Sequence, residues 1–147
     1  MDNPELARVL LIVGSTIYFA LGTAHALATI VDIFRPTFFS PTEIDLVEPL
    51  RKTGVQLAAW FGRRADFWGA WLGFNISHGI GVAFFGLCFL LVGMYRFDLF
   101  QSYLIAPALA IAMGVAYLVL ALNFWFFVPA TGIAIGLLCF IGSYLLA

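Results

Sequence analysis

Long apolar runs dominate the chain, and polar residues gather mainly between them. A helix needs about 20 consecutive apolar residues to cross the hydrocarbon core of a bilayer. Four stretches reach about this length, and they cover residues 6–31, 67–94, 99–122 and 124–146. We therefore predict an all-α fold, a four-transmembrane-helix bundle that forms a single integral membrane domain over residues 1–147.

The last two apolar runs are almost continuous. Asn123 and Pro129 supply a turn signal between them, and the aromatic residues at 124–127 are typical of a membrane interface. We expect a very tight hairpin here.

Composition supports the membrane class. The chain is 63% hydrophobic and 10% charged, and its mean hydropathy is +1.04. These fractions lie well outside those of soluble domains. The formal net charge of −1 and the lack of a basic tail give no reason to expect a nucleic-acid partner. The lipid bilayer is the first expected partner.

The distribution of lysine and arginine predicts the orientation. The loop 32–66 contains Arg35, Arg51, Lys52, Arg63 and Arg64, whereas the opposite side has only Arg8 and Arg96. Cytoplasmic loops are enriched in cations. We expect loop 32–66 to be cytoplasmic, both termini to lie outside, and the protein to reside in a bacterial inner membrane.

The loop is long enough to contain short interfacial amphipathic helices. Ser40 and Glu43 have the spacing of a capping box, so a short helix should begin at Pro41. After Pro49, helical spacing of apolar residues predicts a second helix that reaches Phe61. Such helices can lie among lipid headgroups or pack on a partner subunit, and both interpretations stay open.

Small residues predict how the helices pack. Pairs spaced by four allow two backbones to approach closely. We expect Gly73 and Gly79 at close helix contacts, and the second apolar helix at the centre of the bundle. The full set of predicted packing glycines is Gly69, Gly73, Gly79, Gly114, Gly132 and Gly136.

Polar side chains within the apolar runs form the candidate site. Asn75 and His78 share one stripe of their helix, and at 1.5 Å per residue His78 lies about 18 Å from the loop end. An unpaired amide facing hydrocarbon is costly, so both should point into the bundle. We expect one cavity to gather Tyr18, His25, Trp71, Asn75, His78 and Tyr117.

Three interpretations of this cluster stay open. The polar residues can form hydrogen bonds between helices, line a small-ligand or quinone pocket, or place His25 and His78 as axial ligands of a haem. The absence of any cofactor is the first expectation, and no other metal site is indicated. We expect the Ser77 hydroxyl to bond back to the Gly73 carbonyl. Ser77 is the only serine near a histidine, and its side chain points about 100° around the helix from that of His78, which is a poor arrangement for nucleophilic catalysis. We therefore expect no enzyme.

Three features of the sequence carry a resemblance. They are the run from Trp71 to Gly81, with Gly73-Phe74-Asn75-x-Ser77-His78-Gly79 at its centre, the earlier Gly22-x-x-His25, and the Phe/Pro-rich stretch Phe34-Arg35-Pro36-Thr37-Phe38-Phe39 after the first helix. Together they resemble a family of small bacterial four-helix membrane proteins, loosely DoxX-like. The resemblance covers nearly the whole chain. It implies the four-helix fold and a family role for the region around Asn75 and His78, and it implies no reaction.

Three function classes remain after these exclusions. The first is an accessory or structural subunit that packs against a larger membrane complex, or that self-associates. The second is a membrane-embedded redox, quinone-binding or haem-binding protein. The third is a small-solute carrier, for which the sequence has neither an internal repeat nor a broken helix.

Overall fold

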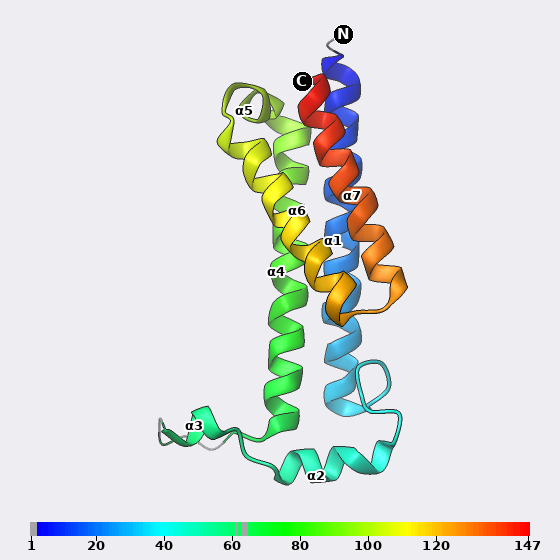
Figure 1. The fold of residues 1–147 in the computed structure, drawn as a ribbon, viewed down its shortest axis with the longest axis vertical. Helices are drawn as coiled ribbons and strands as arrows, with labels where there is room; N and C mark the ends of the chain where they lie inside the picture. The colour runs from blue at the N-terminus through cyan, green and yellow to red at the C-terminus, as the bar shows by residue number, and fades with distance from the viewer. Residues whose placement is uncertain (1–2, 61, 63–64) are drawn as a thin grey trace. The chain divides into compact units, whose positions relative to one another are not determined.

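The computed structural model describes residues 3–60, 62 and 65–147, and it is built from helices (Figure 1). The described residues include four helices long and apolar enough to cross a membrane, namely α1 (Pro4–Phe34), α4 (Phe67–Tyr95), α6 (Ile105–Phe124) and α7 (Phe127–Leu146). The predicted class, an all-α multi-pass membrane protein, is therefore confirmed.

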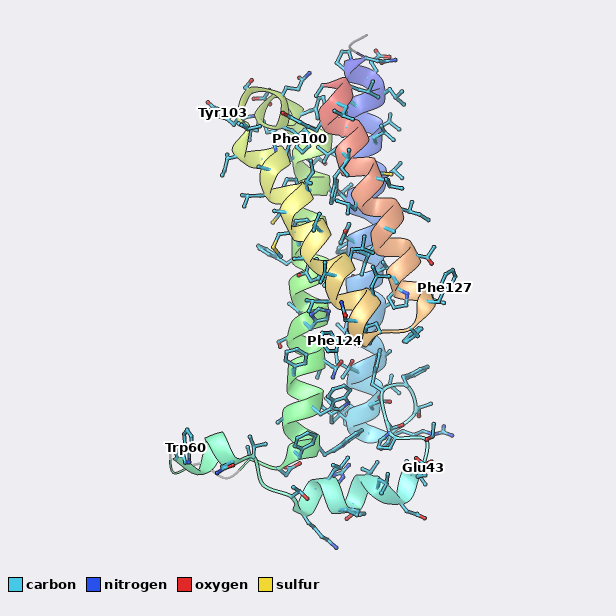
Figure 2. All side chains as sticks on the ribbon, viewed as in Figure 1. Glu43, Trp60, Phe100, Tyr103, Phe124 and Phe127 are labelled. Carbon is cyan, nitrogen blue, oxygen red and sulfur yellow. The ribbon has the colours of Figure 1, made fainter. Side chains whose placement is uncertain are left out.

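The third membrane-spanning helix begins later than expected. A separate short helix, α5 (Phe97–Ser102), comes first. The next residue, Tyr103, is extended, and α6 begins only at Ile105. The tight hairpin between α6 and α7 forms as expected. Trp125 and Phe126 are extended and join the two helices, and the exposed Phe124 and Phe127 flank this connection (Figure 2).

The connecting segment departs from the prediction. No helix begins at Pro41, since the first helical turn there is η1 (Ile44–Leu46), followed by α2 (Val47–Lys52). Glu43 makes no side-chain cap to the helix, and its carboxylate instead accepts a 2.7 Å hydrogen bond from the Thr42 hydroxyl. This bond lowers the pKa of Glu43. The expected capping box is therefore wrong.

The second helix of this segment is interrupted. Thr53 is extended, and α3 (Gln56–Trp60) is a separate short helix. Two backbone hydrogen bonds explain the break, from Val55 N–H to the Ala65 carbonyl and from Phe67 N–H to the Thr53 carbonyl. The chain pairs with itself here instead of continuing the helix. The expected contributions of Phe61, Arg63 and Arg64 fall outside the described residues.

The backbone divides into two compact units. The first contains Met1–Gly22 and Val82–Ala147, and the second contains Thr23–Gly81. A single domain was expected from the sequence, and both α1 and α4 contribute residues to both units.

Tyr18 lies at the centre of the first unit and is fully buried. Its ring stacks on Phe140 with centroids 5.3 Å apart, and its hydroxyl donates a 3.2 Å hydrogen bond to the Ile133 carbonyl. Glycines of the two shorter membrane helices make room for this ring, because a Cβ at Gly136 would overlap it and a Cβ at Gly114 would lie 3.1 Å from its hydroxyl.

Three glycines of α4, spaced seven residues apart, contact three residues of α1 that are also spaced seven apart. The order is reversed, because α1 and α4 run in opposite directions. The pairs are Gly79 with Ala26 in the second unit, and Gly86 with Phe19 and Gly93 with Ile12 in the first. Contacts every seven residues are typical of antiparallel helices that cross at about 20°. The absence of side chains at these glycines lets the α4 backbone approach α1.

The second unit has a small core of its own. The buried residues Val47, Trp68 and Leu72 pack together, with Leu50 against them. The helix α2 thereby packs on the first turns of α4. Asp66 caps α4, because its carboxylate accepts a 2.8 Å hydrogen bond from Gly69 N–H. The start of α4, which carries the candidate site residues, is therefore fixed from two sides.

Candidate functional site

His25 of α1 and His78 of α4 lie side by side in the second unit. Their ring centroids are 5.5 Å apart and the rings meet edge to face at 77°. The contact between Gly79 and Ala26, the next residue after each histidine, sets this distance. A Cβ at Gly79 would lie 2.7 Å from the backbone nitrogen of Ala26. Glycine at this position is what allows the two imidazoles to meet.

Aromatic rings border the histidine pair. The Phe39 ring lies 4.5 Å from the His25 ring, and the Phe74 ring lies 6.1 Å from the His78 ring, nearly parallel to it at 13°. Both imidazoles are half-buried. The rings hold the imidazoles in an apolar setting, where neutral imidazoles can donate and accept hydrogen bonds.

Asn75 is fully buried beside the pair. Its amide nitrogen donates a 2.9 Å hydrogen bond to the Trp71 carbonyl one turn earlier. The amide interacts with His25, although Oδ1 makes no hydrogen bond of good geometry with the described residues. Asn75 thus belongs to the same cluster as the two histidines.

Trp71 connects the site to the segment that follows α1. Its indole N–H donates a 2.9 Å hydrogen bond to the backbone carbonyl of Phe39. The acceptor is a loop carbonyl and not a side chain of the expected cavity. Trp71 is 39% exposed, so it is attached to this part of the structure through its indole N–H and not through a buried ring.

Asp32, near the end of α1, organises that loop. It is fully buried, and its carboxylate accepts hydrogen bonds from three consecutive backbone N–H groups, those of Thr37 (2.8 Å), Phe38 (2.9 Å) and Phe39 (2.6 Å). One turn earlier, the buried Thr29 hydroxyl bonds back to the His25 carbonyl at 2.9 Å. The buried polar groups of this part of α1 are therefore engaged within the chain.

The six predicted site residues fall in two units. His25, Trp71, Asn75 and His78 lie in the second unit, as described. Tyr18 and Tyr117 lie in the first, with ring centroids 6.1 Å apart. A single cavity shared by all six stays a prediction.

The predicted packing glycines also divide. A Cβ at Gly132 would lie 2.9 Å from the Leu21 side chain, so Gly79, Gly114, Gly132 and Gly136 all lie at close contacts with other helices. The expected contact at Gly73 does not form, since no described atom lies within 4 Å of a Cβ there. At Gly69 such a Cβ would meet only Asp66. These two glycines lie on the face of α4 away from Ala26.

The sequence marked Phe39 only as part of the Phe/Pro-rich stretch after the first helix, and it placed neither Phe39 nor Asp32 in the site. Phe39 lies in a loop, and its contacts depend on the path that Asp32 imposes on the backbone. One signal was available. Pro36 has no N–H, so a carboxylate shortly before it can collect the N–H groups that follow.

The haem hypothesis does not fit the geometry. A flat macrocycle between His25 and His78 would have to separate α1 from α4 at these residues, but Gly79 and Ala26 are in backbone contact beside them. Among the described residues, no group of three or more His, Cys, Asp or Glu side chains could hold a metal ion.

A nucleophile paired with a histidine is also not formed at Ser77. Its hydroxyl donates a 2.9 Å hydrogen bond to the Phe74 carbonyl, where the Gly73 carbonyl was expected to accept it. The acceptor is a backbone carbonyl of the same helix and not an imidazole. The cluster can therefore bind or relay through hydrogen bonds, without the Ser77 hydroxyl, which is bonded to its own helix.

Comparisons of this chain with protein-family models, with curated proteins and with solved structures find no match.

Proposed function

We propose that this chain is an accessory subunit that packs, through α4, against a transmembrane helix of a larger membrane protein complex. The observation that carries the proposal is the contrast between two glycine faces of the same helix. The face that includes Gly79 is closed against α1, whereas on another face of the helix no described atom lies within 4 Å of a Cβ added at Gly73 or Gly81.

The open face of α4 is lined by small residues at every fourth position. All of its members are exposed, and they are Gly69, Gly73, Ser77 and Gly81. Residues spaced by four share one side of a helix, and small side chains let a second backbone come close. An apolar helix with a matching shape is the occupant that this face suits.

The polar groups of the second unit give further support. Asp32, Thr29 and the Asn75 amide nitrogen all bond within the chain. These hydrogen bonds lie within one helix or between α1 and the loop that follows it, so they stabilise the second unit itself. The resemblance to DoxX-like proteins agrees with the four-helix fold and adds no reaction to the proposal.

The proposal includes an orientation. We place the protein in a bacterial inner membrane with the loop 32–66 in the cytoplasm and both termini outside. The cation excess of this loop supports this orientation through the positive-inside rule.

Photo-crosslinking tests the subunit role. A photoreactive residue at Ser77, at the centre of the open face, should form a covalent adduct with one defined membrane protein in cells. The same residue placed at Leu138, an exposed position of α7, is the control and should not form that adduct. Adding Gly73→Leu should abolish the adduct, because the larger side chain fills the open face.

The outcomes are distinct. An adduct with a second copy of this chain would show that the open face mediates self-association and not binding to a larger complex. Adducts with lipid only, at both positions, would contradict the subunit role.

A second candidate function rests on the histidine pair. Two imidazoles 5.5 Å apart within a membrane helix pair can hydrogen-bond a small uncharged ligand such as a quinone headgroup. A short-chain ubiquinone analogue, titrated by calorimetry into the purified protein, tests this. Under this hypothesis His78→Gln should keep the fold and weaken binding, and undetectable binding to the wild-type protein would reject it. A carrier role has no comparable support, since α1, α4, α6 and α7 are continuous helices.

A further inference from the structure

Residues 35–39, which follow α1, form a short segment that we name the strap. Each backbone N–H group of the strap donates a hydrogen bond within the protein. Arg35 N–H continues the helix by bonding to the Val31 carbonyl at 2.9 Å, and Pro36 has no N–H. The next three N–H groups, of residues 37, 38 and 39, all bond to the Asp32 carboxylate. One side chain therefore fixes the whole free part of the strap.

The position of Asp32 indicates that it serves the strap rather than the helix. It lies in the last turn of α1, where the helix dipole disfavours a negative charge, and its side chain is buried. Such a carboxylate needs hydrogen bonds from its surroundings. The three strap N–H groups supply them, and hydrogen bonds to an ionised group are the stronger kind.

The far end of the strap is held by α4. The Phe39 carbonyl accepts the hydrogen bond from the Trp71 indole, and the Phe39 ring lies against the His25 ring. The strap thus runs from Asp32 on α1 to Trp71 on α4, and its last residue lies beside the histidine pair.

We propose that the strap is a releasable cover over the His25 side of the His25–His78 pair, and that Asp32 is the group that holds it closed. In the closed state seen here, Phe39 packs on one imidazole of the pair. Release of residues 37–39 from Asp32 moves Phe39 away and opens the pair to small molecules. Trp71 is the second attachment point and strengthens the closed state.

The composition of the chain makes this measurable. The protein has two histidines, and both belong to the pair. Acylation of neutral imidazoles by diethyl pyrocarbonate, followed residue by residue with mass spectrometry, therefore reports on the covered pair alone. The full-length protein in detergent micelles is the sample.

Asp32→Asn is the main variant. Asparagine has one acceptor oxygen, so its amide nitrogen must face at least one strap N–H that now meets the carboxylate. The acylation rate of His25 should rise about tenfold or more, the change expected when a hydrogen bond to a charged group is lost from the closed state. Trp71→Phe keeps an aromatic ring, removes the second attachment, and should raise the rate by a smaller factor.

Asp66→Asn is the matched control. Asp66 is also an aspartate that accepts a backbone N–H in the second unit, but that N–H belongs to Gly69 of α4 and not to the strap. Its variant should leave the His25 rate unchanged. Circular dichroism establishes that each variant is folded, and Trp71→Phe decides the matter if Asp32→Asn does not fold.

Two results would overturn the proposal. One is an unchanged His25 rate in folded Asp32→Asn and Trp71→Phe proteins. The other is an equal rise in the Asp66→Asn control, which would show general loosening of the unit instead of release of the strap.

Discussion

The backbone of α4 at Gly79 touches the backbone of α1 at Ala26, and a Cβ added at Gly79 would lie 2.7 Å from the Ala26 nitrogen. This contact aligns the histidine pair, which precedes it by one residue on each helix. It also separates two faces of α4, because Gly73, six residues earlier, meets nothing within 4 Å among the described residues.

The first prediction compares leucine at these two glycines. Gly79→Leu should lower the free energy of unfolding by roughly 1 to 3 kcal/mol, because the side chain must push α1 and α4 apart. Gly73→Leu should cause no loss and can add up to about 1 kcal/mol, since leucine favours a helix over glycine. Thermal unfolding of both variants in the same detergent makes the comparison.

Equal losses in the two variants would contradict this assignment of faces. They would show that Gly73 also lies against a helix in the folded protein, as the sequence alone had suggested.

How well the sequence predicts a helix of this protein depends on the length of that helix. Long apolar runs have one stable outcome in a bilayer, and so the four membrane helices could be read directly. The short helices between α1 and α4 could not. Their limits are set by the pairing of Thr53 with Phe67 and of Val55 with Ala65, which is tertiary and leaves no local pattern.

The candidate site shows the same division. The proximity of His25 and His78 was predictable, because each is a polar residue on an apolar helix. The contacts of Phe39 were not, because they follow from the loop path that Asp32 fixes.

The helix packing was predicted in part, because Gly79 lies at the expected close contact and Gly73 does not. Glycines spaced by four suggested a close contact at Gly73, yet α4 meets α1 through Gly79, Gly86 and Gly93, spaced by seven. Spacing by seven matches long helices at a small crossing angle.

The second prediction concerns Arg8, which joins the start of α1 to the end of α4. Its guanidinium donates hydrogen bonds to the carbonyls of Gly93 (2.8 Å) and Met94 (2.6 Å), which lie in the last turn of α4. A cation there also complements the helix dipole. Arg8→Gln should lower the free energy of unfolding by about 1 kcal/mol, as measured by thermal unfolding.

Arg51→Gln is its control. Arg51 faces Glu48 at 3.7 Å in an exposed pair one turn apart, and such pairs contribute little, about 0 to 0.5 kcal/mol. A loss at Arg51 as large as that at Arg8 would argue that general charge, and not the contact with α4, is what matters.

The third prediction uses the ion pair at the start of α5, between its N-cap residue Arg96 and Asp98. Arg96 donates two hydrogen bonds of 3.0 Å to the Asp98 carboxylate, which hold the pKa of Asp98 below its usual value. A carboxyl with a depressed pKa stabilises the fold above its unfolded pKa, and this contribution is lost as the pH falls through the lower folded pKa. NMR titration of the Asp98 carboxyl carbon should therefore show a midpoint below the ordinary aspartate value.

Arg96→Gln should move this midpoint upwards, towards the ordinary value. Because both partners are exposed, the substitution should change the Asp98 titration midpoint and leave the melting temperature nearly unchanged. An unchanged midpoint in Arg96→Gln would assign the shift to backbone hydrogen bonds instead.

The last prediction concerns the orientation in the membrane and follows from the cations of the loop 32–66. Thr53→Cys places a thiol on an exposed position of that loop, and Ser102→Cys places one at the exposed end of α5, beyond the other end of α4. Both are made in a background that lacks Cys88 and Cys139. With the loop in the cytoplasm, a membrane-impermeant maleimide should label the Ser102→Cys protein in intact cells and label the Thr53→Cys protein only after permeabilisation. Because α4 crosses the membrane once between the two positions, they must give opposite results. Labelling of the Thr53→Cys protein alone in intact cells would reverse the orientation, and labelling of both proteins would contradict the assignment of α4 as a membrane-spanning helix.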